Sequence, residues 1–557
     1  MDDGLQTTLD LLTETENEAA IRVLIPGLDS RFRAIRHGAL QAILARRSPA
    51  GHREVVARWH TIDSQERYFL EENHRRMMPA LREAILDSDQ QMCVNGCQAA
   101  VSFRQYDLIP TILNALEDTS QPQAAILGQT LMDLADQLCR DLAASRQSGK
   151  HRGRQMAREQ AVASLELSIH RYGKHRRREV VEALALLAHR DNATLKQVLR
   201  DPYHPAFLAL VEVLSRSTRG PILRLLLSYL EDPKAPSAAL SVMAKRRDLD
   251  FAKHLLRKIG RDPSPGIVQN LKRIESVVWT QGSAELLDRL DDLAQEAAVR
   301  LVMLSGIPRA SAFTVIEHLL LRGGRGGRRA AAEALEQFHG AEANALAIEA
   351  LDDDDPEVQA IVLGQLRGRG IAGALGRLVG MLDSAHAVVR RTARRSLAEF
   401  TFPGFLATYD LLDDESRRST GDLVKKVDPQ TVPLLRAEMT SRMRTRRLRA
   451  LAIARTLDLV ALAEGSIVRL LEDEDHVVRA EAAAALAAGQ SVASYDALGA
   501  ATSDRSPAVR EAAQASLAQR ARAAVPPAAA GSSWNLEEVP SAEEKEPSSP
   551  SNEEPRP

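Results

Sequence analysis

This sequence of 557 residues has little of three features that mark common protein classes: cysteine, aromatic side chains and net charge. It contains three cysteines, 4% aromatic residues, and 73 basic against 75 acidic side chains. A balanced charge predicts no bulk attraction to nucleic acid or to membranes. No stretch approaches the ~20 apolar residues of a membrane span, and the first ten residues lack the basic and apolar regions of a secretory signal. We therefore expect a cytoplasmic protein without a membrane span.

The cysteines and glycines do not form a recognisable cofactor site. Cys93 and Cys97 are four residues apart, but no further ligands at metal-site spacing accompany them, so we expect buried free thiols. The glycines of 322–329 lack the preceding strand and the Lys-Ser/Thr ending of a phosphate-binding loop. We interpret 322–329 as a turn between helices, with an RNA-binding Arg-Gly patch as the alternative. The acidic run 352–355 lacks a downstream bidentate glutamate, so a helix-capping turn is favoured over a calcium site.

The sequence instead contains an internal repeat. Aspartate recurs at a step of 30 or 31 residues, and the register passes through Arg322 and Met443, where the aspartate is missing. The members of the series are Asp201, Asp232, Asp262, Asp292, Asp353, Asp383, Asp413, Asp473 and Asp504. A period of this size indicates a solenoid built from one repeated supersecondary unit.

Each repeat is predicted to be a pair of helices around a tight turn. In 460–488, an Ala- and Leu-rich segment is followed by an acidic turn and then by a second segment with apolar residues at helical spacing. We expect the repeated aspartate to accept backbone N–H groups at the start of the second helix and to interact favourably with its dipole. The pattern predicts an all-α fold, a right-handed α-solenoid of stacked helical hairpins.

The regularity of the repeat divides the chain into four predicted segments. Between Asp118 and Asp201 the register slips, because the separation is 83 residues instead of about 90. The Pro-, Ser- and Glu-rich C-terminal segment has too few apolar groups to offset the entropy of ordering, so we expect it to be disordered. The segments are N-terminal repeats at 1–145, irregular basic repeats at 146–200, regular repeats at 201–522 and an acidic tail at 523–557.

The regular units resemble HEAT repeats, in particular the short bacterial type also found in phycobilisome-lyase-like proteins. The resemblance lies in Leu-x-Asp, a short spacer, Val-Arg and then an Ala- and Leu-rich helix. It covers about 200–520 well and 1–200 loosely. It implies a ladder between adjacent repeats, in which a turn aspartate meets a helix arginine. The residues assigned to this ladder are Asp353, Asp383, Arg390, Asp473, Arg479, Asp504 and Arg510.

The catalytic members of this class have signatures that the sequence lacks. Proteins resembling deoxyhypusine hydroxylase bind two irons through His-Glu dipeptides, and none of the fourteen histidines here precedes a glutamate. The HEAT-like DNA glycosylases need a basic, aromatic-lined concavity, and Trp59, Trp279 and Trp534 are widely separated. Phycobilin lyases share the repeat type, but a shared fold does not transfer an activity. We therefore expect no catalytic residues, cofactor or metal, and a lyase-type enzyme is the second alternative.

Clustered positive charge is the strongest signal that the repeat itself does not explain. One cluster lies between Arg146 and Arg178, and the other occupies the turn at 442–449, where the repeat aspartate is missing. Their candidate binding residues are Arg152, Arg154, Lys174, Arg176, Arg177, Arg178, Arg442, Arg444, Arg446, Arg447 and Arg449. The clusters are solvated helix faces, sites for an acidic protein segment or nucleic acid, or contacts for the chain's own acidic tail.

These observations predict a non-catalytic scaffold that binds a protein partner along the concave face of the solenoid. The first alternative is a polyanion or nucleic-acid binder that uses the arginine clusters. The sequence identifies neither the partner nor the oligomeric state.

Overall fold

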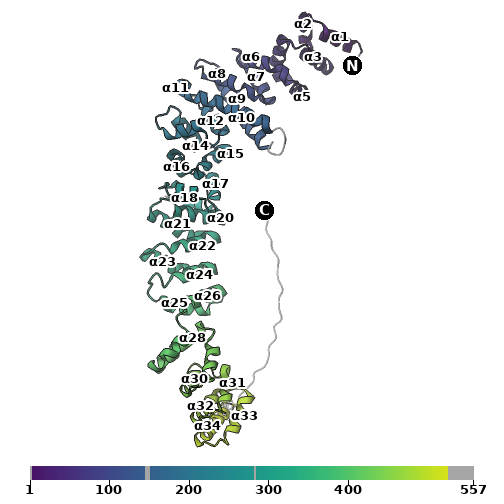
Figure 1. The fold of residues 1–557 in the computed structure, drawn as a ribbon. Coiled ribbons are helices and arrows are strands. Elements are labelled where there is room, and N and C mark those ends of the chain that lie inside the picture. Colours follow the sequence, from purple (N-terminus) through teal and green to yellow (C-terminus); the bar gives the residue numbers. More distant parts are fainter. Residues whose placement is uncertain (1–2, 145–150, 281–283, 525–557) are drawn as a thin grey trace, which may run out of the picture. The chain divides into compact units, whose positions relative to one another are not determined.

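A computed structural model of the protein describes residues 3–144, 151–280 and 284–524 (Figure 1). Within these ranges the chain forms 34 α-helices and no β-strand, which confirms the prediction of an all-α solenoid of helical hairpins. The chain divides into two compact units, 1–371 and 372–557, and each is described by itself. The predictions made for 146–150 and for 525–557, the acidic tail included, lie outside the described residues.

Unit 1 contains α1 to α24. The first nine helices are α1 (Asp3–Glu14), α2 (Ala19–Leu28), α3 (Arg33–Arg46), α4 (Pro49–Ala57), α5 (Ser64–Glu72), α6 (His74–Ile85), α7 (Gln90–Ser102), α8 (Ile109–Glu117) and α9 (Ala124–Ala144). The next nine are α10 (His151–His170), α11 (Tyr172–His175), α12 (Arg178–Leu187), α13 (Ala193–Arg200), α14 (Phe207–Arg216), α15 (Gly220–Ser228), α16 (Ser237–Lys245), α17 (Leu249–Ile259) and α18 (Pro265–Leu271). The last six are α19 (Ala284–Asp288), α20 (Asp292–Leu304), α21 (Arg309–Arg322), α22 (Arg325–Leu335), α23 (Ala341–Glu349) and α24 (Pro356–Gln365).

Unit 2 contains α25 to α34, several of them extended by a single 3-10 turn. The helices are α25 (Ala374–Gly380), α26 (Ala387–Ser396), α27 (Phe402–Thr408), α28 (Asp414–Val427), α29 (Thr431–Met439), α30 (Arg444–Thr456), α31 (Val460–Leu470), α32 (His476–Ala485), α33 (Val492–Ala501) and α34 (Pro507–Ala524).

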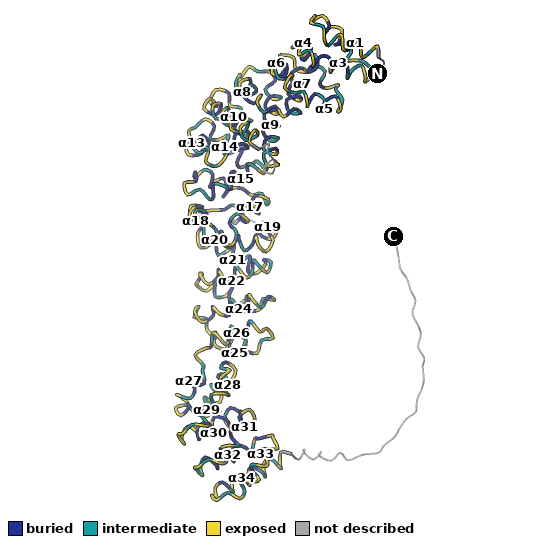
Figure 2. Tube along the Cα trace, turned by 45° about the vertical axis from the view of Figure 1, so that its right-hand side comes forward, coloured by how far each residue is buried: buried dark blue, intermediate teal, exposed yellow. Residues whose placement is uncertain are grey.

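The second helices of successive hairpins pack side by side. In unit 1 one such row runs through α9, α12, α14 and α16 and another through α20, α22 and α24, and in unit 2 a third runs through α30, α32 and α34. We call these helices the second-helix rows. Each of their helices buries one stripe against its neighbours and leaves the opposite stripe exposed, so buried and exposed segments alternate along the trace in Figure 2. Burial of one leucine in such a stripe contributes roughly 1.5–3 kcal/mol, which is the main source of stability in this array.

Helix α22 illustrates how the sequence produces this arrangement. Ala331, Ala332 and Leu335 recur at helical spacing and are buried, whereas Arg329 and Glu333 on the other side are exposed. The small alanine side chains allow α20 and α24 to approach α22 closely on both sides. A helix with this pattern is therefore held by its two neighbours and not by a separate globular core.

Asp413 caps α28 as expected, because its Oδ1 accepts a hydrogen bond from the backbone N–H of Ser416 at 2.8 Å. At the other repeated aspartates the residue does not cap the second helix, which corrects the expected contact there. Asp473 Oδ1 accepts a hydrogen bond from the backbone N–H of Asp475 at 2.9 Å, still within the turn. The cap is Asp475, whose Oδ1 accepts from the N–H of Val477 at 2.8 Å. The same bond to the residue two positions later recurs across the array at Asp87, Asp118, Asp201, Asp232, Asp353 and Asp504. At these positions the period therefore marks a tight side-chain turn before the second helix.

The register slip between Asp118 and Asp201 coincides with two long helices. Helix α9 has 21 residues and α10 has 20, about twice the length of α12 or α14. Helix α10 packs on α8, α9 and α12, so it fills the first-helix position of its repeat. The extra turns of α9 and α10, and not an additional hairpin, account for the separation of 83 residues between Asp118 and Asp201.

The core of unit 2 combines aromatic residues near its start with aliphatic residues of the later hairpins. Phe402 and Phe405 of α27 and the neighbouring Tyr409 are buried in the same cluster as residues of α30, α31 and α32. Tyr409 opens the 3-10 turn η8 (Tyr409–Leu411), and its hydroxyl lies 3.3 Å from Thr456 Oγ1 of α30. Helix α27 is thereby held against α30, and this contact shapes a groove described below.

Candidate interaction surfaces

A ladder of arginines connects the turns of successive repeats. In unit 2, Arg479 of α32 is 4% exposed and forms a two-pronged ion pair with Asp504 of the next turn, at 2.9 and 3.0 Å. Its Nη1 donates to the carbonyl oxygens of Asp473 at 2.8 Å and Glu474 at 3.2 Å in the preceding turn. One guanidinium therefore holds the turn before its helix and the turn of the following repeat together.

The same geometry recurs at arginines of both units. Each donates Nη1 to a carbonyl oxygen five or six residues earlier, in the turn before its own helix. These arginines are Arg36, Arg328, Arg390, Arg447 and Arg510. Arg36, Arg328 and Arg447 also reach a carboxylate of the next repeat, as Arg479 does. Arg447, assigned from the sequence to an anion-binding cluster, thus occupies a ladder position, with its Nε 2.7 Å from Asp473 Oδ2.

The ladder is modified where the sequence departs from the repeat pattern. Gln359 stands at the arginine position of its unit and donates Nε2 to the carbonyl oxygen of Asp353 at 2.6 Å, so it keeps the bond within the turn. A neutral amide offers no charge to a following turn. Asp383 pairs with Lys426 Nζ at 2.5 Å, and Arg390 bonds to the carbonyl oxygens of Ser384 and Ala385.

Arginines beside these turns lower the pKa of two carboxylates, whereas burial raises the pKa of the ladder residue Asp353. The hydrogen bonds from Arg479 hold the pKa of Asp504 below its ordinary value, and those from Arg329 do the same for Asp355. Both aspartates are therefore ionised at neutral pH. Arg479 is buried in its contact, whereas Arg329 remains partly exposed beside Asp355.

The second arginine cluster is largely engaged within unit 2. Arg444 lies 3.1 Å from Asp475, Arg446 lies 3.7 Å from Glu438, and Arg449 lies 3.3 Å from Asp410. Arg442, Arg444 and Arg446 nevertheless keep exposed side chains at the start of α30. The cluster thus combines one buried ladder residue, Arg447, with a partly solvated basic rim.

The structure separates the first cluster into two groups at opposite ends of α10. This helix has 20 residues and so rises about 30 Å. Arg152 and Arg154 lie in its first turn, whereas residues 174–178 follow its C-terminal end. The cluster therefore does not form one compact patch, because the whole length of α10 separates its two groups of residues.

Several members of this cluster have structural partners. Arg154 of α10 donates to the carbonyl oxygen of Asp141 on α9 at 3.1 Å. Arg177 donates to the carbonyl oxygen of Leu116 at 3.1 Å and so satisfies the C-terminal end of α8. Arg178 pairs with Glu212 of α14 at 3.4 Å, while Arg152, Lys174 and Arg176 are exposed.

Residues 322–329 form the turn between α21 and α22 and the first helical turn of α22. The backbone N–H of Gly324 donates to Gln295 Oε1 at 2.7 Å. A Cβ at Gly324 would overlap Oδ1 of Asp292 on α20, so a larger residue there would have to displace this carboxylate. Arg328 pairs with Asp353, and Arg329 pairs with Asp355 at 2.7 Å.

The exposed faces of the second-helix rows in unit 1 mix both signs of charge. Arg178 of α12 lies beside Glu212 of α14, and Arg216 shares that same carboxylate at 3.0 Å. On α22, Arg329 and Glu333 are both exposed one turn apart. Such a face offers paired charges of both signs, and not one continuous positive potential.

A cleft in unit 1 is an exception to this charge balance. It has a volume of about 470 Å³ and lies between the ends of α9 and α12, the start of α10 and one face of α15. Among the described residues its lining includes three arginines and a histidine but no carboxylate: Arg158, His189, Arg190 and Arg224. Outside the lining, Arg190 pairs with Glu231 at 2.9 Å and His189 lies 3.2 Å from Asp191. Arg158 is oriented by a 2.7 Å bond from Nε to the carbonyl oxygen of Leu187.

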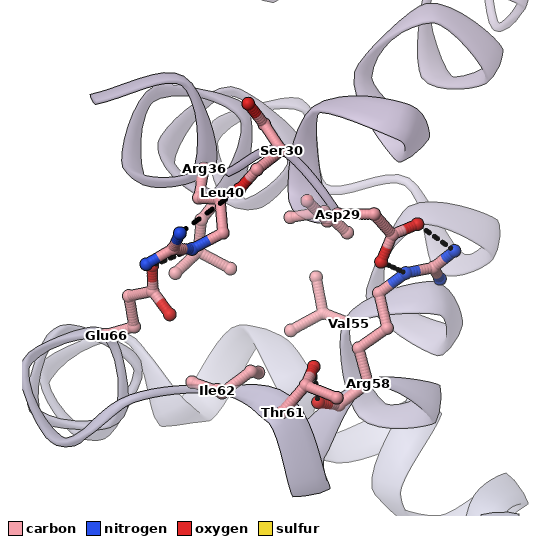
Figure 3. A pocket seen from close by; sticks show the side chains of 10 residues that line it. Asp29, Ser30, Arg36, Leu40, Val55, Arg58, Thr61, Ile62 and Glu66 are labelled. Atoms are coloured by element: carbon pink, nitrogen blue, oxygen red, sulfur yellow. Dashed lines mark hydrogen bonds and ion pairs between the residues drawn. The ribbon is translucent and has the colours of Figure 1, made fainter. Parts of the chain in front are cut away.

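Another pocket, of about 400 Å³, lies near the N-terminus among α2, α3, α4 and α5 (Figure 3). Two ion pairs stand on opposite sides of it: Arg36 with Glu66 at 3.0 Å and Arg58 with Asp29 at 2.7 Å. Leu40 and the other aliphatic side chains lie between them. Because both guanidinium groups already have carboxylate partners, an anionic ligand would have to displace these pairs.

The described residues show neither a metal-binding group nor a membrane-spanning helix. No set of three or more His, Cys, Asp or Glu side chains within them is arranged to hold a metal ion. None of the helices placed in the structure is long and apolar enough to cross a membrane. Cys93 and Cys97 are buried free thiols as predicted, and the hydrogen bond with Cys97, together with burial, raises the pKa of Cys93.

No protein-family profile and no curated protein matches this chain. One similar solved structure comes from work on a phosphorylation switch that controls the interaction between cadherin and beta-catenin. It is 15% identical, with 90% of this chain and 99% of that chain covered and a TM-score of 0.35. The crystal structure of Kap121p is 11% identical over 92% of this chain and 71% of that chain, with a TM-score of 0.21. Values this low carry no functional conclusion, and the fold assignment rests on the stacked hairpins themselves.

Sequence reasoning did not find the cleft or the groove beside α30. The cleft takes its arginines from α10, α15 and the turn after α12, which are far apart in the sequence. The repeat period predicts that hairpins stack, but it does not specify which side chains meet across two of them. For the cleft, Arg158 carried a usable signal as part of the first basic cluster, and for the groove, Arg446 and Arg449 did so as part of the second.

Proposed function

We propose that this protein is a non-catalytic scaffold that binds a protein partner along the second-helix rows. The observation that carries the proposal is the mixture of acidic and basic side chains on an extended exposed face, shown by Arg178, Glu212, Arg329 and Glu333. Protein partners offer charges of both signs and are recognised by complementary patterns. The backbone of nucleic acid carries only negative charge, so the glutamates of this face repel it.

The arginine ladder supports this role. It fixes the turns of successive repeats relative to each other, so the face is organised before a partner arrives. A preorganised surface binds more tightly because less conformational entropy is lost on association. The buried arginines thus contribute geometry, while the exposed side chains contribute recognition.

Site-specific photo-crosslinking in cells tests the proposal. A photoreactive amino acid replaces Glu333, which is exposed on the second helix α22, and in a matched variant it replaces Glu342, which is exposed on the first helix α23. The scaffold predicts a discrete protein adduct at position 333 and little at position 342. Equal labelling of both positions, or adducts with nucleic acid alone, would contradict it.

The second candidate is a polyanion binder, and the cleft lined by Arg158, His189, Arg190 and Arg224 favours it. If about six cationic side chains contacted phosphates, the logarithm of the binding constant would fall with log salt at a slope near −5. Binding of duplex DNA and of single-stranded RNA between 50 and 200 mM salt, with Arg224→Glu as the variant, tests this. Absence of binding at 50 mM removes the candidate. Among the described residues, no observation favours a lyase-type activity.

A further inference from the structure

Unit 2 contains an open groove that is apolar at its base and basic at its rim. It has a volume of about 570 Å³ and lies between the end of α27 with η8 and one face of α30. Met443 and Leu448 provide apolar surface, and Arg446 and Arg449 provide positive charge. Each arginine also has one carboxylate beside it: Glu438 lies 3.7 Å from Arg446, and the lining residue Asp410 lies 3.3 Å from Arg449. Met443 is 57% exposed, and Leu411, the neighbour of the lining residue Asp410, is 85% exposed. Such exposed apolar side chains beside arginines are typical of a surface that another segment covers.

The composition of the C-terminal segment complements this groove. Residues 525–557 contain seven glutamates against one lysine and one arginine, a net charge of −5. Trp534, Leu536 and Val539 stand close together in that segment, with Glu537 and Glu538 between them. The large apolar residues match the base of the groove, and the glutamates match the rim formed by the start of α30.

The segment is long enough to reach the groove from its point of attachment. It follows Ala524 at the end of α34, and α34, α32 and α30 pack side by side in unit 2. Two helix spacings of 8–10 Å each across the row and at most the length of α34 along it, about 27 Å, combine at right angles to a straight-line distance of up to about 34 Å. The ten residues from Val525 to Trp534 extend to about 33–36 Å, and the twelve residues to Leu536 extend to about 40–43 Å.

Charge favours α30 over the nearer surfaces of unit 2. The turn before α32 carries Asp473, Glu474 and Asp475, which repel an acidic segment. Arg442 lies in the turn before α30, and Arg444 and Arg446 lie in the first turn of this helix; all three are exposed. Attachment to the same chain gives a short segment an effective concentration near the millimolar range, so a weak contact is sufficient for docking.

We propose that residues 534–539 of the C-terminal segment occupy the groove between α27 and α30 of the same molecule. Trp534 and Leu536 cover Met443 and Leu448, and Glu537 and Glu538 meet the basic rim. The inference does not depend on the identity of a scaffold partner. A partner with a similar apolar and acidic segment would compete for the same groove.

Acrylamide quenching of tryptophan fluorescence in the full-length protein tests this docking. Trp59 and Trp279 are 2% and 1% exposed, so they contribute little to quenching. The difference between the wild-type protein and Trp534→Phe isolates Trp534. Docking predicts that Trp534 is protected relative to the free peptide 525–557, and that Met443→Glu abolishes this protection.

The matched control is Leu462→Glu, because Leu462 of α31 is 56% exposed, almost as much as Met443. It must leave Trp534 protected, and circular dichroism checks that both variants keep their helices. Wild-type Trp534 that is quenched like the free peptide overturns the proposal, as does loss of protection in Leu462→Glu. Protection that increases with protein concentration assigns the segment to the groove of a second copy and overturns the intramolecular form.

Discussion

Removal of the Arg479 side chain should destabilise the last hairpins of unit 2 far more than removal of an exposed arginine nearby. Arg479→Ala leaves Asp504, which is 15% exposed, without its two-pronged partner and leaves two turn carbonyl oxygens without their donor. Loss of one member of a buried pair costs about 3–5 kcal/mol. Because Asp504 retains some contact with water, we expect a value near the lower end, about 3 kcal/mol.

The matched control is Arg455→Ala in the same unit. Arg455 and Glu481 are 3.4 Å apart, and their side chains are 53% and 49% exposed. An exposed pair of this kind contributes about 0.2–1 kcal/mol. The two variants delete the same side chain, so their difference reports burial and geometry.

Hydrogen exchange followed by mass spectrometry measures the effect locally, in peptides from α32 and α34. A loss of about 3 kcal/mol corresponds to a roughly 100-fold increase in the opening equilibrium, since 1.4 kcal/mol is tenfold. Adding Asp504→Asn to Arg479→Ala should recover part of the loss, because the unpaired carboxylate is removed. If Arg479→Ala exchanges like Arg455→Ala, the ladder does not hold the turns and the reasoning fails.

Three further outcomes follow from the same structure. Gly324→Ala should lower the thermal midpoint of unit 1 in a tryptophan-fluorescence melt through overpacking that costs about 1–3 kcal/mol, whereas Gly153→Ala, with open space around its Cβ, should not. The hydrogen bond from Arg329 lowers the pKa of Asp355, so this pair contributes stability above about pH 4 that is lost as the pH falls further. In urea unfolding measured at a series of pH values, Asp355→Asn should therefore make the free energy of unfolding depend less on pH on the acid side. In native protein a thiol reagent should leave both cysteines of α7 unmodified and react slowly with the half-buried Cys139, whereas all three react in denaturant.

The sequence was sufficient for the fold because the repeat appears in local patterns. The 30- or 31-residue period, the turn aspartates and the Ala- and Leu-rich helices each reflect contacts within one hairpin or between adjacent hairpins. A period alone, however, could not place the cap. The sequence near Asp473 contains several acidic residues, and only the backbone geometry distinguishes the turn residue Asp473 from the cap Asp475.

The roles of the arginines were decided by the tertiary structure. In the sequence, Arg446 and Arg447 belong to the same basic cluster. In the structure Arg447 is buried against Asp473, while Arg446 remains half-exposed beside a groove. Neighbouring helix positions point about 100° apart, and the packing of the next repeat determines which of them is desolvated.

The sequence by itself therefore determined an all-α array of hairpins and the buried thiols of α7. Only the tertiary structure decided the division near residue 371, the separation of the first basic cluster along α10, and the cleft and groove built from different hairpins. The physical reason is the range of the interactions. Helix formation and neighbour stacking act over one repeat and leave a periodic signal, whereas a binding surface depends on the side chains that distant segments bring together.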